Sequence, residues 1–409
     1  MAKDVHPPRG MRDFLPVEKN RRDQVLTKIR ETYLGHGFQE IETPALEDLA
    51  RLTSGQGGDN EKLAFRVMKR GAELEAALAA SDGEDNLADL GLRYDLTVPL
   101  TRYYATNHAK LPKVFKALQT GPVWRAERPQ KGRYRQFVQC DIDIIGDASI
   151  LAEIELLNAS LDALTAIGLT DATIRVNHRV LLANLLEQLG VPDDGKGSAM
   201  ITIDKLDKIA AEGVVAELGE KFDAGVAARA AEWLTAISGN LPVPAELKEI
   251  FVAIEARFGA GRLRFDPTLV RGMGYYTGSI FEIEHPESGS SIGGGGRYDG
   301  MVGRWLGTDA PAVGISIGFE RAVDLVADQA SDLKAIVLVL DNAEPTVIGN
   351  ALRVQQQAIA AGYRVRLEQR PKKLNNLLDS MAEQGFASFA TVGEEFVNFG
   401  ELSIRNIAN

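Results

Sequence analysis

The segment from Arg125 to Arg135, RAERPQKGRYR, concentrates residues that could bind an anion. It carries five cations and one carboxylate, Glu127, in a chain whose formal net charge is −11. Guanidinium groups are always charged and bind phosphate oxygens through two parallel hydrogen bonds. A basic segment is often only a solvated surface turn. Here the alternation of Arg125 and Glu127, and the apolar pattern of the flanking residues, favour a ligand-binding role.

The residues on either side of this segment alternate with a period of two, which is typical of β-strands. In QFVQCDIDIIG the apolar residues fall on one face, and Gln139, Asp141 and Asp143 fall on the other. Before the segment, Arg125 and Glu127 also share a face. The pattern predicts a β-hairpin with one apolar face, one charged face and a basic loop at its tip. Such a charged face suits a ligand that has both phosphate and ammonium groups.

Three further stretches carry candidate site residues. Asp95 and Thr97 lie where a predicted strand passes into a helix, and Arg321 lies at the start of another helix. Arg271 lies beside two glycines and precedes the pair Tyr275–Tyr276. Arginines from three separate segments would suit a triphosphate. Neither GxxxxGK[ST] nor GxGxxG after a strand is present, so arginines on a sheet, rather than a glycine-rich loop, are predicted to hold any nucleotide.

Some of these features have simpler interpretations. Asp95 alone is more often a helix cap than a ligand. The glycines at 293–296 could form a flexible linker, but the RYDG that follows them favours close approach of the backbone to a ligand. The five histidines show no metal-binding spacing and there is one cysteine, so no metal site made by protein side chains is predicted.

The composition limits the class of protein. A chain of 409 residues is expected to form two or three domains. The single cysteine, Cys140, falls on the apolar strand face and indicates a buried thiol in a reducing cytoplasm. No apolar run is long enough to span a membrane, and the N-terminus lacks an apolar signal core. The acidic balance argues against non-specific nucleic-acid binding, although local basic patches remain compatible with a nucleic-acid partner.

The element pattern predicts an α+β core and a smaller α/β domain. Helices are expected at Pro16–Tyr33, from Thr97 to about Asn107, and at about Ser149–Ile167, with strands among them and a surface insertion at 71–89. Residues 334–409 alternate strands and helices and have eight cations and eight carboxylates, so the net charge lies before them. The predicted divisions are 1–179 (core, first part), 180–258 (helical insertion), 259–330 (core, second part) and 334–409.

Six stretches together resemble one known family. GPVWRAERPQKGRYRQF is similar to motif 2 of the class II aminoacyl-tRNA synthetases, GFQEIETPALE to motif 1, and GISIGFER to motif 3. LVRGMGYYTGSIFE and SIGGGGRYDGMVG resemble two peptides peculiar to histidyl-tRNA synthetases, and LRYDLTVP matches that family as well. The resemblance covers nearly the whole chain in the family's order. It implies the class II fold, an antiparallel sheet flanked by helices, with a helical insertion and a C-terminal domain like an anticodon-binding domain.

The resemblance implies roles for individual residues. Those at the ATP end would be Arg125 and Arg271 on the α-phosphate, with Glu127, Arg133 and Arg321 on the adenine and outer phosphates. Those at the histidine end would be Asp95, Thr97 and Gln139 on the α-ammonium group, and Asp143, Tyr276 and Tyr275 at the imidazole. Mg²⁺ would bridge the outer phosphates. The partners implied are L-histidine, ATP and tRNA(His), and a homodimer through the segment Gly37–Glu47.

The sequence departs from the family pattern in two features, and two other functions are considered. The family usually has Leu at Met273 and an acidic residue at Gly274, and it commonly continues into a final helix beyond Asn409, so the C-terminal domain is expected to be shortened. One rival is a regulatory paralogue that acts with ATP phosphoribosyltransferase in histidine biosynthesis. The other is an amino-acid-activating enzyme without tRNA binding. Because Arg125, Arg271 and Arg321 are all present, the sequence favours a histidine–tRNA ligase.

Overall fold

The computed structural model describes residues 5–53, 63–80, 84–130, 132–237, 241–270, 275–327 and 334–407. The chain divides into two compact units, one of residues 1–13 and 25–326 and one of residues 14–24 and 327–409. Within the described residues, no helix has both the length and the apolar character to cross a membrane. The finer division of the first unit into core and insertion stays a prediction.

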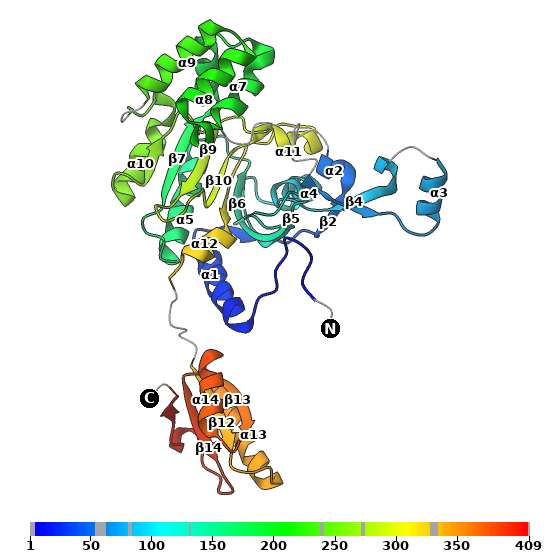
Figure 1. Cartoon of the computed structure of the whole chain (residues 1–409), viewed down its shortest axis with the longest axis vertical. Coiled ribbons are helices and arrows are strands. Elements are labelled where there is room, and N and C mark those ends of the chain that lie inside the picture. Colours follow the sequence, from blue (N-terminus) through cyan, green and yellow to red (C-terminus); the bar gives the residue numbers. More distant parts are fainter. Residues whose placement is uncertain are drawn as a thin grey trace. The chain divides into compact units, whose positions relative to one another are not determined.

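An eight-stranded sheet forms the centre of the first unit (Figure 1). The two edge pairs are parallel and the other five neighbouring pairs are antiparallel, which confirms the predicted α+β class. In spatial order the strands are β1 (Gln39–Glu40), β5 (Phe115–Trp124), β6 (Gln136–Ile145), β11 (Ala312–Gly318), β10 (Gly293–Arg297), β9 (Ser279–Glu284), β7 (Thr173–His178) and β8 (Leu263–Phe265).

The predicted hairpin is the pair β5–β6, in which ten residues of each strand face one another. Cys140, Ile142 and Ile144 are fully buried in the core on one face of the sheet. Gln139 and Asp143 lie on the opposite face, as the period of two predicted. The backbone alternation therefore sends adjacent residues of β6 into two different environments, one apolar and one polar.

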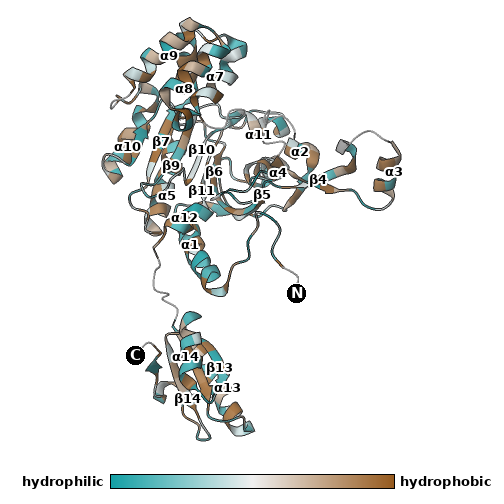
Figure 2. Ribbon diagram, in the orientation of Figure 1, coloured by the Kyte–Doolittle hydropathy of each residue, from teal (hydrophilic) through white to brown (hydrophobic). Residues whose placement is uncertain are grey.

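Helices α1 (Pro16–Gly35), α5 (Leu151–Ala166) and α10 (Lys248–Phe258) contribute to the apolar core of this sheet. The i, i+4 spacing of Val25, Ile29 and Tyr33 on α1 and of Leu157 and Leu161 on α5 turns these side chains inward. Figure 2 shows that α5 is mostly hydrophobic, whereas α1 is mostly hydrophilic. The helices predicted for these two segments are confirmed, with ends that differ by up to two residues.

The segment FQEIETPAL divides between two sheets. Only Gln39–Glu40 joins the central sheet, and the chain then enters a second, three-stranded sheet in the order β2 (Leu46–Asp48), β4 (Ala88–Leu92), β3 (Phe65–Met68). Pro44 lies between the two strands, where it can donate no backbone hydrogen bond and restricts the residue before it. The predicted surface insertion contains a helix, α3 (Ala72–Ala80), which projects beside β4 in Figure 1.

Several short helices complete the first unit. They are α2 (Leu49–Thr53), α4 (Thr97–Asn107), α11 (Asp299–Leu306) and α12 (Phe319–Leu325). Helix α4 has the predicted bounds, and its buried side chains share a core with those of α11.

The helical stretch after β7 is confirmed as helical, and most of it forms its own apolar cluster. Its helices are α6 (Arg179–Gln188), α7 (Lys196–Ile203), α8 (Leu206–Lys221) and α9 (Ala224–Ala236). Helix α10 instead packs into the core of the central sheet.

The glycine cluster at 293–296 is not a linker. It forms β10, an inner strand of the central sheet between β9 and β11. A Cβ atom added at Gly295 would lie 2.0 Å from the carbonyl oxygen of Gly314, so only glycine fits this close approach of two strands. The neighbouring strand β9 begins at Ser279, and residues 271–274 lie outside the described residues.

The second unit contains a four-stranded sheet in the order β13 (Arg364–Gln369), β12 (Ala335–Leu340), β14 (Ser388–Val392), β15 (Arg405–Asn406). Helices α13 (Pro345–Ala360) and α14 (Leu374–Glu383) connect its parallel strands. Both faces of β12 are buried, which explains its continuous apolar sequence AIVLVL. The predicted alternation of strands and helices in this domain is confirmed.

A buried ion pair ties α5 to the end of β10. Nε and Nη2 of Arg297 donate to the two carboxylate oxygens of Glu153 at 2.7 and 2.5 Å, and the two residues are 8% and 2% exposed. Removing one partner of such a pair leaves an uncompensated buried charge.

We therefore expect Glu153→Ala to lower the free energy of unfolding of the first unit by about 3 kcal/mol or more. Urea titration followed by tryptophan fluorescence and circular dichroism would measure the change. As a matched control, Asp193→Ala removes an exposed partner of Lys196 and should leave the unfolding midpoint unchanged. Equal midpoints for the wild type and Glu153→Ala would contradict the assigned role of the pair.

Candidate functional site

A cavity of about 520 Å³ opens over the polar face of the central sheet. Its walls come from β6, β10, β11, the start of α4, the loop after β5 and the start of α12. The structure brings ten of the eleven predicted site residues to this cavity, namely Asp95, Thr97, Arg125, Glu127, Arg133, Gln139, Asp143, Tyr275, Tyr276 and Arg321. The eleventh, Arg271, lies outside the described residues, as do Met273 and Gly274.

Strand β6 supplies the polar floor of the cavity. Gln139, Asp141 and Asp143 are 8%, 4% and 3% exposed. Asp143 lies opposite Gly314 of β11, and a Cβ atom at Gly314 would come within 1.9 Å of its Oδ1. The hydroxyl of Tyr298 donates to the same oxygen at 2.6 Å. A glycine on the neighbouring strand therefore makes room for the Asp143 carboxylate, and a buried tyrosine orients it.

Asp95 has two roles in the structure. Its Oδ1 accepts a hydrogen bond from the backbone N–H of Val98 at 3.1 Å, so it caps the first turn of α4. The capping interpretation of this residue is therefore confirmed. Asp95 also lines the cavity together with Thr97, because the strand-to-helix junction points towards the polar floor.

Burial dominates the titration of the cavity carboxylates. It raises the pKa of Asp143 to about 7, against the hydrogen bond from Tyr298. Burial also raises the pKa of Asp141 well above its ordinary value, and the neighbouring Asp143 adds to this shift. The pKa of Asp95 is raised by burial too, although the N–H of Val98 and the charge of Arg125 oppose the shift. Three carboxylates that resist ionisation form a site suited to a cationic ligand.

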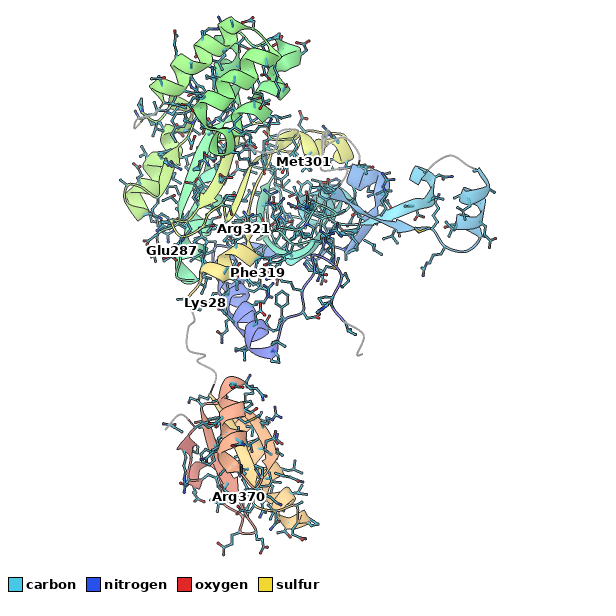
Figure 3. All side chains as sticks on the ribbon, viewed as in Figure 1. Lys28, Glu287, Met301, Phe319, Arg321 and Arg370 are labelled. Carbon is cyan, nitrogen blue, oxygen red and sulfur yellow. The ribbon has the colours of Figure 1, made fainter. Side chains whose placement is uncertain are left out.

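Arginines also line this cavity. Nε of Arg125 donates to the carbonyl oxygen of Tyr94 at 3.0 Å, and its guanidinium carbon lies 4.9 Å from the centre of the Phe137 ring. Arg321, which Figure 3 shows at α12, donates from Nε to the carbonyl oxygen of Gly132 at 3.3 Å. This contact joins the basic loop to α12. The cavity thus combines fixed positive charge with the carboxylates of β6.

The two tyrosines lie against each other at the cavity wall. Their ring centres are 4.4 Å apart with an angle of 58° between the rings, and the hydroxyl of Tyr275 lies 3.3 Å from that of Tyr276. Both are half-buried and line the cavity. An aromatic wall next to Asp143 and Tyr298 would suit a planar, polar ring.

Sequence reasoning did not identify three residues that line the cavity, Tyr298, Ser316 and Glu320. Glu320 accepts from the backbone N–H of Val138 at 3.1 Å and from Nη2 of Arg12. The motifs RYDG and GFER contain Tyr298 and Glu320, but nothing in their local pattern shows that they face the same cavity. Asp141 was placed on the polar face of β6 but received no role.

Comparison with known proteins agrees with this geometry. A family profile described as "Histidyl-tRNA synthetase" matches residues 10–322. The histidine–tRNA ligase of Leifsonia xyli subsp. xyli is 54% identical over 416 residues, which cover 96% of each chain. The probable histidine–tRNA ligase of Tropheryma whipplei is 43% identical, with 94% of this chain and 95% of that one covered.

The chain belongs to the histidyl-tRNA synthetase family. Among solved structures, that of the histidyl-tRNA synthetase from Nostoc sp. PCC 7120 superposes with a TM-score of 0.77 at 25% identity and covers 98% of this chain and 97% of that one. Membership of this family confirms the resemblance derived from the six motifs and the class II fold.

The comparisons also bear on the regulatory alternative. A Bacillus halodurans C structure titled as an ATP phosphoribosyltransferase regulatory subunit/histidyl-tRNA synthetase has a TM-score of 0.74, but at 19% identity it shows only a shared fold. The relatives of 54% and 43% identity are both named as ligases. The family evidence therefore favours the synthetase over the regulatory paralogue.

The pKa of Asp143 has a consequence for stability. An unfolded aspartate titrates near pH 4, and Asp143 titrates at about 7 in the folded protein. The folded state binds this proton more tightly, so the stability it contributes is complete below about pH 4 and is lost as the pH rises towards 7. Asp143→Asn has no ionisable group at this position. We therefore expect its melting temperature to rise relative to that of the wild type as the pH increases from about 5 to about 8.

Differential scanning calorimetry of the ligand-free proteins would measure this difference across the pH range. A difference in melting temperature that does not change with pH would contradict the raised pKa of Asp143.

Proposed function

We propose that this protein uses ATP to convert L-histidine into histidyl-adenylate and then transfers the histidyl group to the 3′ end of tRNA(His). The observation that carries the proposal is the division of charge in one cavity. Gln139, Asp141 and Asp143 of β6 form a floor for a cationic amino acid, and Arg125 and Arg321 line the same cavity where they can meet phosphate. Family membership supports this choice of substrates.

The histidine end would be organised by the carboxylates. The α-ammonium group would bind Asp95, Thr97 and Gln139, which line one part of the cavity. The imidazole would bind Asp143 and Tyr276, with Tyr275 beside it. A site built to hydrogen-bond a ring nitrogen rejects apolar competitors, because their binding leaves its buried polar groups unpaired.

The ATP end would be organised by the arginines. Arg125 would contact the α-phosphate, and Arg271 would contact it from the opposite side. Glu127 and Arg133, whose side chains lie 3.9 Å apart, would contact the adenine and outer phosphates together with Arg321. The hydrogen bonds that Arg125 and Arg321 make to backbone carbonyl oxygens hold these side chains in place before the ligand binds.

The chemistry then requires no covalent protein intermediate. The carboxylate of histidine attacks the α-phosphorus in line and pyrophosphate leaves. Correct positioning and fixed positive charge lower the barrier, since negative charge spreads over the phosphate oxygens in the transition state. A ribose hydroxyl of the terminal tRNA adenosine next attacks the activated carbonyl carbon, and AMP leaves.

Mg²⁺ would enter with ATP. The ion takes few ligands from proteins and is bound mainly by phosphate oxygens and water. The part of the chain that the structure describes contains no group of three or more His, Cys, Asp or Glu side chains suited to a metal.

Family membership supports the remaining partners. The C-terminal domain at 334–409 would read the tRNA(His) anticodon. A homodimer would form through Gly37–Glu47, a segment in which Leu46 is 42% exposed. The buried thiol of Cys140 agrees with a cytoplasmic location.

Two assays on the full chain test the function. We expect histidine-dependent exchange of radiolabelled pyrophosphate into ATP, followed by charging of a tRNA(His) transcript. Absence of exchange would reject the enzyme and leave the regulatory paralogue. Exchange without charging would instead support an activating enzyme that has lost tRNA binding. Phenylalanine in place of histidine is the control for specificity.

The arginines can be tested separately. Arg125→Ala and Arg271→Ala should each lower pyrophosphate exchange by roughly two to three orders of magnitude, because each removes positive charge from the α-phosphate in the transition state. Arg264→Ala is a matched control, since Arg264 is exposed and does not line the cavity. Unchanged melting temperatures would exclude unfolding as the cause, and near-normal exchange would reject the role given to that arginine.

A further inference from the structure

Asp141 forms part of the cavity floor but has no individual contact in the function proposed above, although it is among the most buried polar residues of the cavity. It lies between Gln139 and Asp143 on the polar face of β6, opposite Gln119 of β5 and Ser316 of β11. It is 4% exposed. Keeping a carboxylate here is costly, because burial and the nearby Asp143 both disfavour its charged form.

The hydrogen bonds around Asp141 define the orientation of Gln139. Nε2 of Gln139 lies 3.3 Å from Oδ1 and 3.4 Å from Oδ2 of Asp141, and 3.2 Å from Oγ of Ser316. Ser316 in turn has a side-chain hydrogen bond with Asp141. In this arrangement the NH₂ group of the Gln139 amide faces Asp141 and Ser316 and donates to both.

This orientation determines what Gln139 offers to a ligand. With its NH₂ group turned to Asp141 and Ser316, the amide has only its oxygen left for other partners. That oxygen, Oε1, is buried and finds no hydrogen-bond donor among the residues that the structure describes. A buried acceptor without a donor is costly, and a ligand that brings an N–H group would relieve this cost.

We propose that Asp141 is a positioning residue for recognition of the substrate's ammonium group, because its carboxylate holds the Gln139 amide with the oxygen available to that group. This inference rests on the proposed function, since it deepens the assignment of the amino-acid end of the cavity. It makes Asp141 act through Gln139, whereas Asp143 would contact the imidazole.

The test uses two ligands that differ only in the ammonium group, L-histidine and 3-(imidazol-4-yl)propanoate. Affinities are measured by calorimetry on the full chain and by competition in the exchange assay. Asp141→Asn should weaken histidine binding about tenfold or more, because its amide can donate to Gln139 and allows the Gln139 amide to turn over. Its affinity for the propanoate should change by less than about twofold, and KM for ATP should stay constant.

Asp143→Asn is the contrasting variant, since it should lower the affinities for both ligands by similar factors. The proposal would be overturned if Asp141→Asn lowered both affinities equally, or if it left the affinity for histidine unchanged. Failure of the wild type to bind histidine would instead reject the proposed function. The melting temperature of each variant shows whether it is folded. If Asp141→Asn is poorly folded, the neutral variant Asp141→Ser replaces it.

A rescue experiment separates positioning from a purely structural role. Gln139→Glu presents two acceptor oxygens whichever way its side chain is turned. When added to Asp141→Asn, it should restore part of the lost histidine affinity. A double variant that binds histidine no better than Asp141→Asn would contradict the proposed action through Gln139.

Discussion

The structure of the first unit depends on the burial of carboxylates in the middle of a β-sheet. Asp141 and Asp143 lie on β6, between β5 and β11, and both are nearly inaccessible to water. Charged groups are not kept in such a place without partners or a ligand. The unfavourable burial of these carboxylates therefore indicates that the cavity is built for a cation, and it explains several features of the strands around it.

Most of those features make room for the buried carboxylates or orient them. Gly314 leaves room for the Asp143 carboxylate, and the glycines of β10 allow the neighbouring strands to approach closely. Tyr298 follows β10 directly and donates its hydroxyl proton to Asp143. The buried pair of Arg297 and Glu153 anchors the same end of β10 to α5. The cavity and the buried ion pair thus share one short segment of chain.

The positive charge of the site has a different origin. It comes from a loop and a helix start rather than from inner strands, and its main residues, Arg125 and Arg321, are held by backbone carbonyl oxygens at 3.0 and 3.3 Å. An arginine is weakly hydrated and always charged, so it can be pre-oriented at a partly exposed position at little cost. One cavity thus combines carboxylates buried in the sheet with arginines at its margin.

The sequence by itself determined the strand pair β5–β6 and the separation of its residues into two faces, because alternation with a period of two is a local property of the chain. The contents of the cavity could be predicted in large part once the motifs were matched to a family. Local pattern could not place Tyr298, Ser316 and Glu320, since their roles depend on which strands and helices lie side by side.

The register of β11 against β6 brings Ser316 to Asp141 and Gly314 to Asp143. The same reason applies to the glycine cluster, which becomes an inner strand only because two neighbouring strands pair with it. Interactions between residues far apart in the chain, such as the 155-residue separation of Asp143 and Tyr298, are decided by the tertiary structure alone.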